Sequence, residues 1–331
     1  MPSKPWIFLF RPWSFAATLV PFLIAAGLTT DCADVRWGRW ALGLISGVLF
    51  QATVNLLNTW GDERSGVDDV PGAIRTTPQV HDGLVSLRAV LVVAVACAFL
   101  ASALGLALCF FRDGAQVWRF DWTLLIAGLT GLLGATNYTT GIKFKYRGLG
   151  VPFVSFLMGP LECFVALALL SPDAWTCFHP LDALSFLVIT LPVAALVGVI
   201  LHGNDMRDIP TDRAAGIVTF ASRLGPKRAL VYYALCHVLP YVVWMGLLVL
   251  LVALARPRPG VVRCLALLAP LLALPLSVKT VRTAIAVYRT DPACPPWRRL
   301  ERASGAIHLV FNAAYAVFLA AVGGILGDVG P

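Results

Sequence analysis

Charged residues are scarce in this sequence: Asp, Glu, Lys and Arg make up 13% of its 331 residues, whereas a soluble domain carries about 25%. Hydrophobic residues make up 58%, and the mean hydropathy is +0.79. A soluble core of this size could not bury so much apolar surface, so the composition excludes disordered, fibrous and ordinary soluble globular proteins. A lipid bilayer must be the solvent for most of the chain.

Closely spaced cysteine pairs are also missing. The eight cysteines are scattered without a CxxC pair, and most lie inside apolar runs, where cysteine behaves as a small hydrophobe. The sequence therefore predicts neither a disulfide framework nor a zinc site. No cleavable signal peptide is evident either, because the first apolar run, from Trp13, continues into Thr29-Thr30-Asp31 without a small-residue cleavage site.

Long apolar runs are abundant. A membrane-spanning helix needs about 20 mostly apolar residues, and nine segments qualify: 13–29, 40–60, 84–111, 122–140, 151–171, 181–204, 228–255, 261–280 and 304–326. The proline and glycine residues within them are tolerated in bundled membrane helices. The sequence thus predicts an all-α polytopic membrane protein with nine transmembrane helices.

The positive charges are unevenly distributed between the two sides of this predicted bundle. With the N-terminus in the cytoplasm, 19 of the 26 Lys and Arg residues lie on the cytoplasmic side. The positive-inside rule therefore predicts a cytoplasmic N-terminus and a C-terminus on the opposite side. The net charge of +8 accordingly indicates orientation in the membrane, and no nucleic-acid partner is expected. The oligomeric state stays open.

The acidic residues are concentrated in two windows, residues 55–69 and 202–213, which hold seven of the 18 carboxylates. Each window closes an apolar segment on the cytoplasmic side, and each leads into a loop long enough to act as a cap, at about 61–83 and 205–227. The active-site loops are therefore expected to be cytoplasmic.

Both windows pair asparagine with aspartate at a four-residue spacing, which places the two side chains on one helix face. Asn58 precedes Asp62 by four residues, and Asn204, Asp208 and Asp212 repeat the spacing. Pro210 is expected to bend or end the second helix. Carboxylates beside a membrane bundle are costly and mark function by default, whereas a merely solvated helix end would not explain the repeated pairing.

This arrangement predicts a site for Mg²⁺, which prefers oxygen ligands and commonly binds one or two carboxylates together with substrate phosphates. Basic residues accompany the acids, as a diphosphate site requires. They include Arg75 in the first cap, Lys143 and Lys145 in the loop after the fourth span, and Arg207 in the second window. For the two lysines, topology signalling alone is the alternative.

Together these motifs resemble the UbiA superfamily of intramembrane prenyltransferases, and most closely its menaquinone branch, which comprises bacterial MenA-type enzymes and their animal relatives. The resemblance covers nearly the whole chain. The segments that carry it are Arg11-Pro-Trp-Ser-Phe15, Asn55-Leu-Leu-Asn58-Thr-Trp-Gly-Asp62 with Gly66-Val-Asp68, Tyr138-Thr-Thr-Gly141 with Phe144-Lys145-Tyr146, Gly159-Pro160, and Asn204-Asp-Met-Arg207-Asp208 with Asp212-Arg213-Ala-Ala-Gly216-Ile-Val-Thr219.

The resemblance implies one domain over residues 1–331, built as two four-helix pseudo-repeats plus one helix. It implies Mg²⁺-dependent transfer of an isoprenyl group from a polyprenyl diphosphate to an aromatic acceptor. In this branch the acceptor is typically 1,4-dihydroxy-2-naphthoate or a related naphthoquinol, as in menaquinone biosynthesis. The isoprenyl tail would lie among the spans, open to membrane lipid.

The resemblance also implies roles for individual residues. The Mg²⁺ ligands would be Asp62, Asp68, Asp208 and Asp212. The residues that help to bind metal or diphosphate would be Asn58, Arg75, Lys143, Lys145, Asn204 and Arg207. Tyr138 would lie near the reacting carbon.

The sequence departs from the branch pattern at three positions, and the first two bear on the aromatic acceptor more than on the prenyl diphosphate. Val151 stands where an acid normally follows the Leu-Gly pair, Glu162 stands at a place that is usually apolar, and Asp205 follows Asn204 where animal relatives have a second asparagine. Glu162 lies 11 residues after Val151, so both share a helix face about 16 Å apart. We expect Glu162 to face the central cavity and touch substrate; the alternative is a protonated glutamate bonded to a neighbouring helix.

Because Val151 replaces the usual acid, other functions stay open. A UbiA-type intramembrane terpene cyclase would ionise the diphosphate without an aromatic acceptor, and a further alternative is prenyl transfer to a different acceptor. A lipid sensor or transporter would need no paired metal sites.

Overall fold

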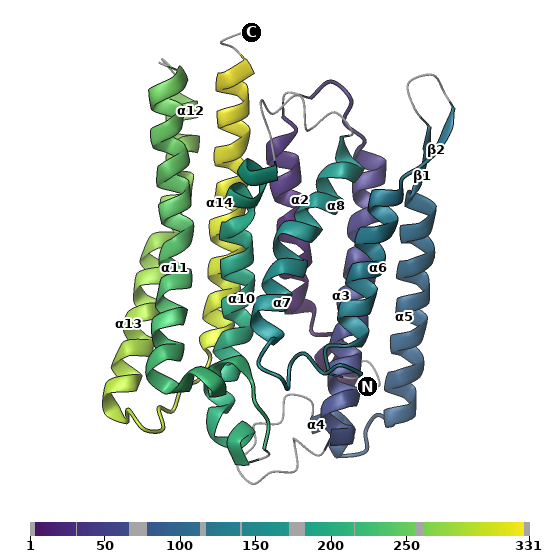
Figure 1. Cartoon of the computed structure of the whole chain (residues 1–331), viewed down its shortest axis with the longest axis vertical. Coiled ribbons are helices and arrows are strands. Elements are labelled where there is room, and N and C mark those ends of the chain that lie inside the picture. The colour runs from purple at the N-terminus through teal and green to yellow at the C-terminus, as the bar shows by residue number, and fades with distance from the viewer. Residues whose placement is uncertain are drawn as a thin grey trace.

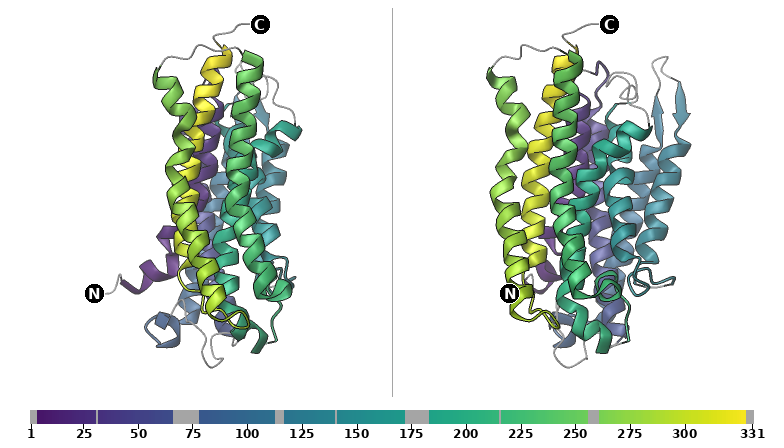
Figure 2. Two further views of the ribbon diagram at one scale, coloured as in Figure 1. Left: turned by 90° about the vertical axis from the view of Figure 1, so that its left-hand side faces the viewer. Right: turned by 60° about the vertical axis from the view of Figure 1, so that its left-hand side comes forward.

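The computed structural model describes residues 4–30, 32–65, 78–112, 117–139, 141–171, 183–214, 216–255 and 261–327. Long helices run side by side along one axis, and the two ends of the chain lie at opposite ends of the bundle (Figure 1). Two further views show the same parallel arrangement from the side (Figure 2). The prediction of an all-α polytopic fold is confirmed.

The first part of the chain forms helices α1 (Lys4–Phe10), α2 (Ala16–Leu28), α3 (Trp37–Ser65), α4 (Pro78–His81), α5 (Leu87–Leu108) and α6 (Trp122–Thr136). The second part forms α7 (Gly150–Phe156), α8 (Glu162–Leu170), α10 (Ala183–Ala214), α11 (Phe220–Ala255), α12 (Val261–Leu268), α13 (Leu274–Thr290) and α14 (Leu300–Gly327). A 3₁₀ turn (Pro12–Phe15) joins α1 to α2, a π-helical turn (Leu157–Leu161) joins α7 to α8, and a 3₁₀ turn (Ala269–Ala273) joins α12 to α13.

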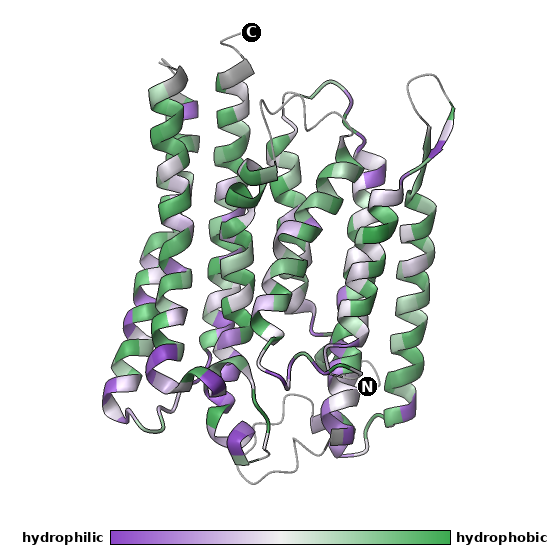
Figure 3. Cartoon of the chain, in the orientation of Figure 1, coloured by the Kyte–Doolittle hydropathy of each residue, from purple (hydrophilic) through white to green (hydrophobic). Residues whose placement is uncertain are grey.

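Each of the nine predicted spans corresponds to a helical segment. Among the described residues, eight helical segments are long and apolar enough to cross a membrane, and α6 is a shorter apolar helix of 15 residues. Large apolar side chains cover the outer faces of α5 and α11, including Phe99, Leu235 and Val249. Figure 3 shows the apolar residues along the length of the helices and the polar ones gathered toward the end where α10 and α13 turn. Such outer faces are expected where lipid is the solvent.

Two helices extend beyond the membrane at this polar end. α10 has 32 residues, which span about 48 Å, so it exceeds a hydrocarbon core of about 30 Å. It continues through Pro210 to Ala214, and the predicted helix end at that proline does not occur. α3 likewise carries Asp62 on its last turns before ending at Ser65. Much of each acidic window is therefore helical.

The opposite end of the bundle carries a small exception to the all-α pattern. Strands β1 (Phe110–Arg112) and β2 (Trp118–Phe120) pair antiparallel, with Phe111 opposite Arg119. The Asp121 side chain then caps α6 by accepting hydrogen bonds from the backbone amides of Thr123 and Leu124. Trp118 and Trp122 are exposed there, as is typical of aromatic residues at a membrane–water interface.

One sequence prediction about cysteine is wrong. Cys32, in the connection between α2 and α3, is disulfide-bonded, although no disulfide was expected. The prediction relied on closely spaced cysteine pairs, and such spacing gives no information about residues that only the fold brings together. The exposed Cys294, between α13 and α14, forms no disulfide.

Small residues let the helices approach one another closely. A Cβ atom on Gly27 of α2 would lie 2.5 Å from the carbonyl oxygen of Ala316 in α14, and one on Gly159 would lie 2.7 Å from Cβ of Ala194 in α10. Because lipid tails are as apolar as leucine, membrane helices associate through such close packing. The α2–α14 contact thus joins the beginning and the end of the chain.

We expect Gly27→Ala to destabilise the protein by about 1–3 kcal/mol, the usual cost of overpacking, because the new methyl group meets a backbone carbonyl that cannot rotate away. Thermal unfolding in detergent measures the effect. The control is Gly128→Ala on α6, where a Cβ meets no atom within 4 Å. Equal melting temperatures for the two variants would contradict the close α2–α14 contact.

Candidate active site

An ion pair forms the centre of the polar end of the bundle. Lys145 Nζ donates to both carboxylate oxygens of Asp62, at 2.8 and 3.0 Å, and the hydroxyl of Tyr146 donates to Oδ1 at 2.6 Å. Asp62 comes from the last turns of α3, whereas the other two residues come from the loop after α6. The contact therefore joins the first acidic window to the basic loop.

Backbone hydrogen bonds hold the basic loop, residues 137–149, in place. The amide of Phe144 donates to the carbonyl of Asn137 at 3.1 Å, and the amide of Lys145 donates to that of Tyr138 at 3.0 Å. Gly150 allows the loop to fold tightly, because a Cβ there would lie 3.2 Å from the Tyr138 hydroxyl. The backbone thus fixes where the Lys145 side chain begins.

A second glycine brings this loop against α3. A Cβ on Gly61 would lie 2.8 Å from Oγ1 of Thr139. The residue next to Gly61 is Asp62, so the close approach at Gly61 is what places the carboxylate within reach of Lys145.

The second acidic window lies on α10 and is held from both sides. Thr219 donates its hydroxyl to Oδ2 of Asp212 at 2.7 Å, and Arg207 forms a two-pronged ion pair with Asp208 at 2.6 and 2.7 Å. Arg207 also lies 3.7 Å from Glu301 at the beginning of α14. Asp205 and Asp212 are 7% and 6% exposed, so the window turns carboxylates inward.

The two windows meet. The carboxylates of Asp205 and Asp212 both interact electrostatically with Lys145, and Asp212 also interacts with Asp62. A parallel bridge between Arg147 and Val218 ties the basic loop to the segment after α10. Lys145 therefore lies among carboxylates from both acidic windows.

The electrostatics keep Lys145 charged. Burial by itself lowers the pKa of Lys145, but the charge of Asp62, with help from Tyr146 and Tyr138, outweighs it and raises the pKa above the ordinary value. Burial raises the pKa of Tyr138, and the nearby Asp205 carboxylate raises it further. The site thus holds a cationic lysine and a neutral tyrosine.

Several polar atoms near these groups are buried without a hydrogen-bond partner in the described parts of the chain. They are the Tyr138 hydroxyl, Oδ1 of Asn58 and the hydroxyl of Ser155 on α7. Buried polar groups are normally paired. Further atoms without a described partner lie elsewhere in the bundle, such as Nε of Arg39 and Nε2 of His308, but the Tyr138 hydroxyl and Oδ1 of Asn58 adjoin the ion pair and fit a place where a bound molecule completes the set.

The predicted site residues divide into three groups. The structure brings Asp62, Tyr138, Lys145, Arg207, Asp208 and Asp212 together, with Asn58 and Asn204 one turn before Asp62 and Asp208. Lys143 is exposed, with a left-handed backbone (φ 57°), and among the described residues its side chain takes part in none of the hydrogen bonds or ion pairs of the cluster. Asp68 and Arg75 lie outside the described residues.

Four residues at this site were not predicted from the sequence. Asp205 lies seven residues before Asp212 and so shares its helix face, a spacing that was visible. Tyr146 and Thr219 stood inside the recognised motifs without an assigned role. Glu301 had no signal at all, because only folding brings the beginning of α14 to Arg207.

The donor set suits a hard cation. The polar end supplies carboxylate and amide oxygens, the ligands that Mg²⁺ prefers. Within the described ranges, no three His, Cys, Asp or Glu side chains converge closely enough to hold a metal by themselves. A diphosphate would add oxygens, and Lys145 and Arg207 would offset its charge.

A model of the UbiA prenyltransferase family matches residues 15–286, which include both acidic windows and the basic loop. The chain belongs to the UbiA prenyltransferase family. It is thus an intramembrane prenyltransferase. Similar members are UbiA prenyltransferase domain-containing protein 1 of Mus musculus and of Homo sapiens, each 31% identical over 260 residues that cover 74% of this chain and 70% of the relative.

Solved structures of the family share this fold. A UbiA homolog from Archaeoglobus fulgidus, bound to GPP and Mg²⁺, superposes with a TM-score of 0.57 at 16% identity, over 95% of this chain and 99% of that one. An apo UbiA homolog from Aeropyrum pernix K1 gives a TM-score of 0.59 at 14% identity, over 92% and 97% of the two chains.

Glu162 lies within the bundle, away from the polar end. It begins α8 directly after the π-helical turn, a feature frequent at functional sites. Its Oε1 lies 3.5 Å from the position that a Cβ on Gly47 of α3 would take, and Thr18 of α2 borders the same position. Val151 is fully buried one helix earlier, beside Gly198 of α10. That Glu162 touches substrate stays a prediction.

We expect Glu162→Gln to lower turnover by roughly 100-fold if the carboxylate accepts a proton, or to change the product distribution if it only positions substrate. Expression level and melting temperature should stay those of the parent, because the substitution keeps the shape of the side chain. Product analysis by mass spectrometry, with unfolding measured in parallel, separates these outcomes. Unchanged kinetics and products would make Glu162 a structural residue.

Proposed function

We propose that this prenyltransferase transfers an isoprenyl group from a polyprenyl diphosphate to an aromatic acceptor, 1,4-dihydroxy-2-naphthoate or a related naphthoquinol. The observation that supports diphosphate binding most directly is the position of Lys145, a charged side chain between Asp62 and the carboxylates of α10. A cation so placed, with acids on either side, suits a metal-bound diphosphate better than a simple helix end.

The residues present fit Mg²⁺. The candidate ligands are Asp62, Asp208 and Asp212, with Asp205 as an addition from the structure and Asp68 from sequence analysis alone. The donors are all oxygens, and Oδ1 of Asn58 is buried without a described partner. When bound, Mg²⁺ neutralises the diphosphate and favours its departure. The archaeal homolog that binds GPP and Mg²⁺ has this fold, which supports the assignment.

The chain's own residues would perform the other tasks. Lys145 and Arg207 would pair with the diphosphate oxygens, and the neutral Tyr138 hydroxyl would face the carbon that loses the diphosphate. The apolar bundle would exclude water from that allylic carbon, since water would otherwise capture it. An electron-rich aromatic ring would then attack the carbon and lose a proton.

The acceptor follows from the resemblance to animal and bacterial menaquinone enzymes and is supported by the similarity to the animal relatives. Val151 weakens this assignment, because it replaces an acid and is fully buried. The second candidate is therefore an intramembrane terpene cyclase, which needs the same diphosphate site and no acceptor.

The deciding assay supplies geranylgeranyl diphosphate and Mg²⁺ to the purified protein in lipid, with and without 1,4-dihydroxy-2-naphthoate. We expect a prenylated naphthoquinol only when the acceptor is present. A hydrocarbon or terpene alcohol formed without acceptor would replace the proposal with the cyclase. A diphosphate that is never consumed would contradict both.

We expect Asp62→Ala and Asp208→Ala each to lower turnover by about 100-fold or more. Each substitution would remove a ligand of the cation, which stabilises the charge that develops in the transition state by several kcal/mol. Turnover measured across a Mg²⁺ titration checks this, and the loss should be partly relieved at high Mg²⁺. The control is Asp82→Ala, an exposed acid before α5. Near-normal activity of either variant at low Mg²⁺ would remove that residue from the site.

We also propose that the N-terminus and the site face the cytoplasm and the C-terminus the opposite side. The positive-inside count supports this, and so does the disulfide at Cys32, which lies at the other end of α3 from Asp62. Disulfides persist in oxidising compartments and are rare in the cytosol, so the end of the bundle that carries Cys32 is expected to face away from the cytoplasm.

The exposed thiol of Cys294, between α13 and α14, can be labelled to show which side of the membrane the candidate active site faces. In sealed vesicles of known sidedness, a membrane-impermeant maleimide should label it only when the cytoplasmic face is outward. Cys294→Ser identifies the signal, and labelling from the other face would reverse the orientation.

A further inference from the structure

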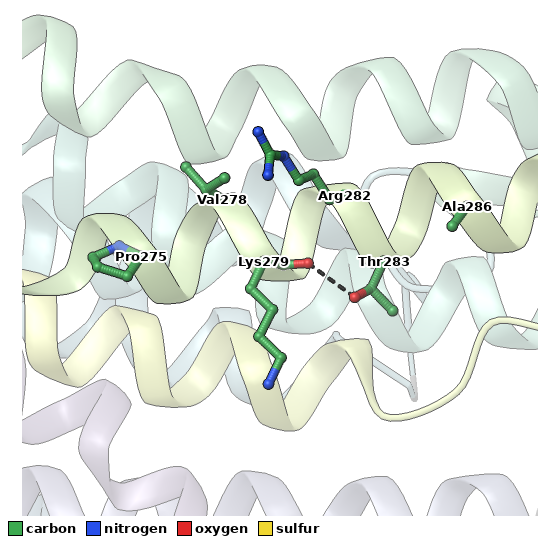
Figure 4. Close-up of a pocket in the computed structure, with 6 residues that line it drawn as sticks. All are labelled: Pro275, Val278, Lys279, Arg282, Thr283 and Ala286. Carbon is green, nitrogen blue, oxygen red and sulfur yellow. Dashed lines mark hydrogen bonds between the residues drawn. The ribbon is translucent and has the colours of Figure 1, made fainter.

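One face of α13, on the outside of the bundle, carries two basic residues. Lys279 and Arg282 are both exposed, and together with Pro275, Val278, Thr283 and Ala286 they line a groove of about 400 Å³. Figure 4 shows these six residues along the helix, with the two long side chains extending in opposite directions. All six belong to α13, so this groove, the α13 face, lies on the outside of the bundle.

The depth of the α13 face in the membrane follows from counting along the span. Arg263, near the beginning of α12, precedes Lys279 by 16 residues and Arg282 by 19, and no charged residue lies in between from 264 to 278. At about 1.5 Å per residue these separations are about 24 and 28 Å, against a hydrocarbon core of about 30 Å. The two cations therefore lie at the headgroup boundary, on the side where α13 ends at Thr290.

No described side chain neutralises these charges. Within the described ranges, neither Lys279 nor Arg282 forms an ion pair, and α13 contains no acidic residue at all. The hydroxyl of Thr283 donates to the carbonyl of Lys279 at 2.9 Å, so its oxygen remains able to accept. The two residues are three positions apart on one helix face, so their Cβ atoms lie about 5–6 Å apart. Their flexible side chains extend in opposite directions in Figure 4 and would turn toward each other to contact one phosphate.

The residues deeper in the membrane suit an acyl chain. Toward the bilayer centre, the surface continues through exposed apolar side chains, Leu271, Leu272 and Leu274. A cationic end followed by an apolar surface matches a molecule with an anionic head and hydrocarbon tails. Basic sites on transmembrane helices at the headgroup level bind anionic phospholipids in this way.

We propose that the α13 face is a binding site for an anionic phospholipid, with the lipid phosphate at Lys279 and Arg282 and an acyl chain along Val278 and the leucines below. The site lies in the leaflet on the same side as the candidate active site, because α13 leads into the beginning of α14, where Glu301 lies 3.7 Å from Arg207. It uses none of the residues assigned to prenyl transfer, so it stands independently of the proposed function.

The test compares the protein in phosphatidylcholine nanodiscs with and without phosphatidylglycerol, and native mass spectrometry counts the lipid that stays bound. Lys279→Gln combined with Arg282→Gln should weaken phosphatidylglycerol retention by roughly 30-fold, since each cation contributes about a fivefold factor near an anionic headgroup and the two factors multiply. The control, Lys227→Gln with Arg228→Gln, removes the same charge from exposed positions on α11 and should leave retention unchanged.

A second measurement uses the unaltered protein and does not depend on folding of the variants. A phosphatidylglycerol analogue with a photoreactive headgroup should label peptides of α13, and unlabelled phosphatidylglycerol, but not phosphatidylcholine, should protect them. Labelling spread over all basic segments, or an equal loss in the control variant, would reduce the effect to general surface charge and overturn the proposal. Protection by inorganic phosphate alone, or labelling lost on dimer formation, would assign the α13 face to a free anion or to a second copy and overturn it as well.

Discussion

The ion pair between Lys145 and Asp62 is the contact on which the polar end of this bundle depends. Without a cation between them, the inward-facing carboxylates of α3 and α10 would repel one another in a partly dry environment, where charge interactions are strong. Lys145 interacts with acids from both windows. The loop that carries it is tied to α3 at Gly61 and to the segment after α10 through Arg147 and Val218. One cation thus organises two halves of the chain.

The bilayer explains why this cluster lies at an end of the bundle. Charged side chains are expensive in hydrocarbon, so α3 and α10 carry their acids on turns that extend beyond the core. Inside the core, contact between helices relies on small residues such as Gly27 and Gly159. Under the proposed function, the substrate would divide in the same way, with the isoprenyl tail among the spans and the charged diphosphate at the polar end.

Three positions depart from the pattern of the menaquinone branch, and the structure shows where each lies. Val151 is buried beside Gly198, and the Ser155 hydroxyl, which has no partner among the described residues, lies one turn further along α7. Glu162 lies beyond the π-helical turn, next to α2 and α3. Asp205, the third departure, interacts with Asp212 and Lys145 and so belongs to the polar end. Under the proposed function, Val151 and Glu162 would bear on the acceptor, whereas the diphosphate end would be common to aromatic transfer and cyclisation.

The fold class, the apolar spans and the two Asn/Asp windows were predictable from the sequence alone, because hydrophobic run length and four-residue spacing depend only on neighbours along one helix. The sequence also identified Lys145 through its motif, and family resemblance supplied its role. Which charged groups meet depends on the tertiary structure. Asp62 binds Lys145 and Tyr146 across more than 80 residues of chain, Arg207 lies within reach of Glu301, Lys143 is exposed, and Cys32 is disulfide-bonded. Such contacts depend on how separate helices pack, and spacing within one helix carries no information about them.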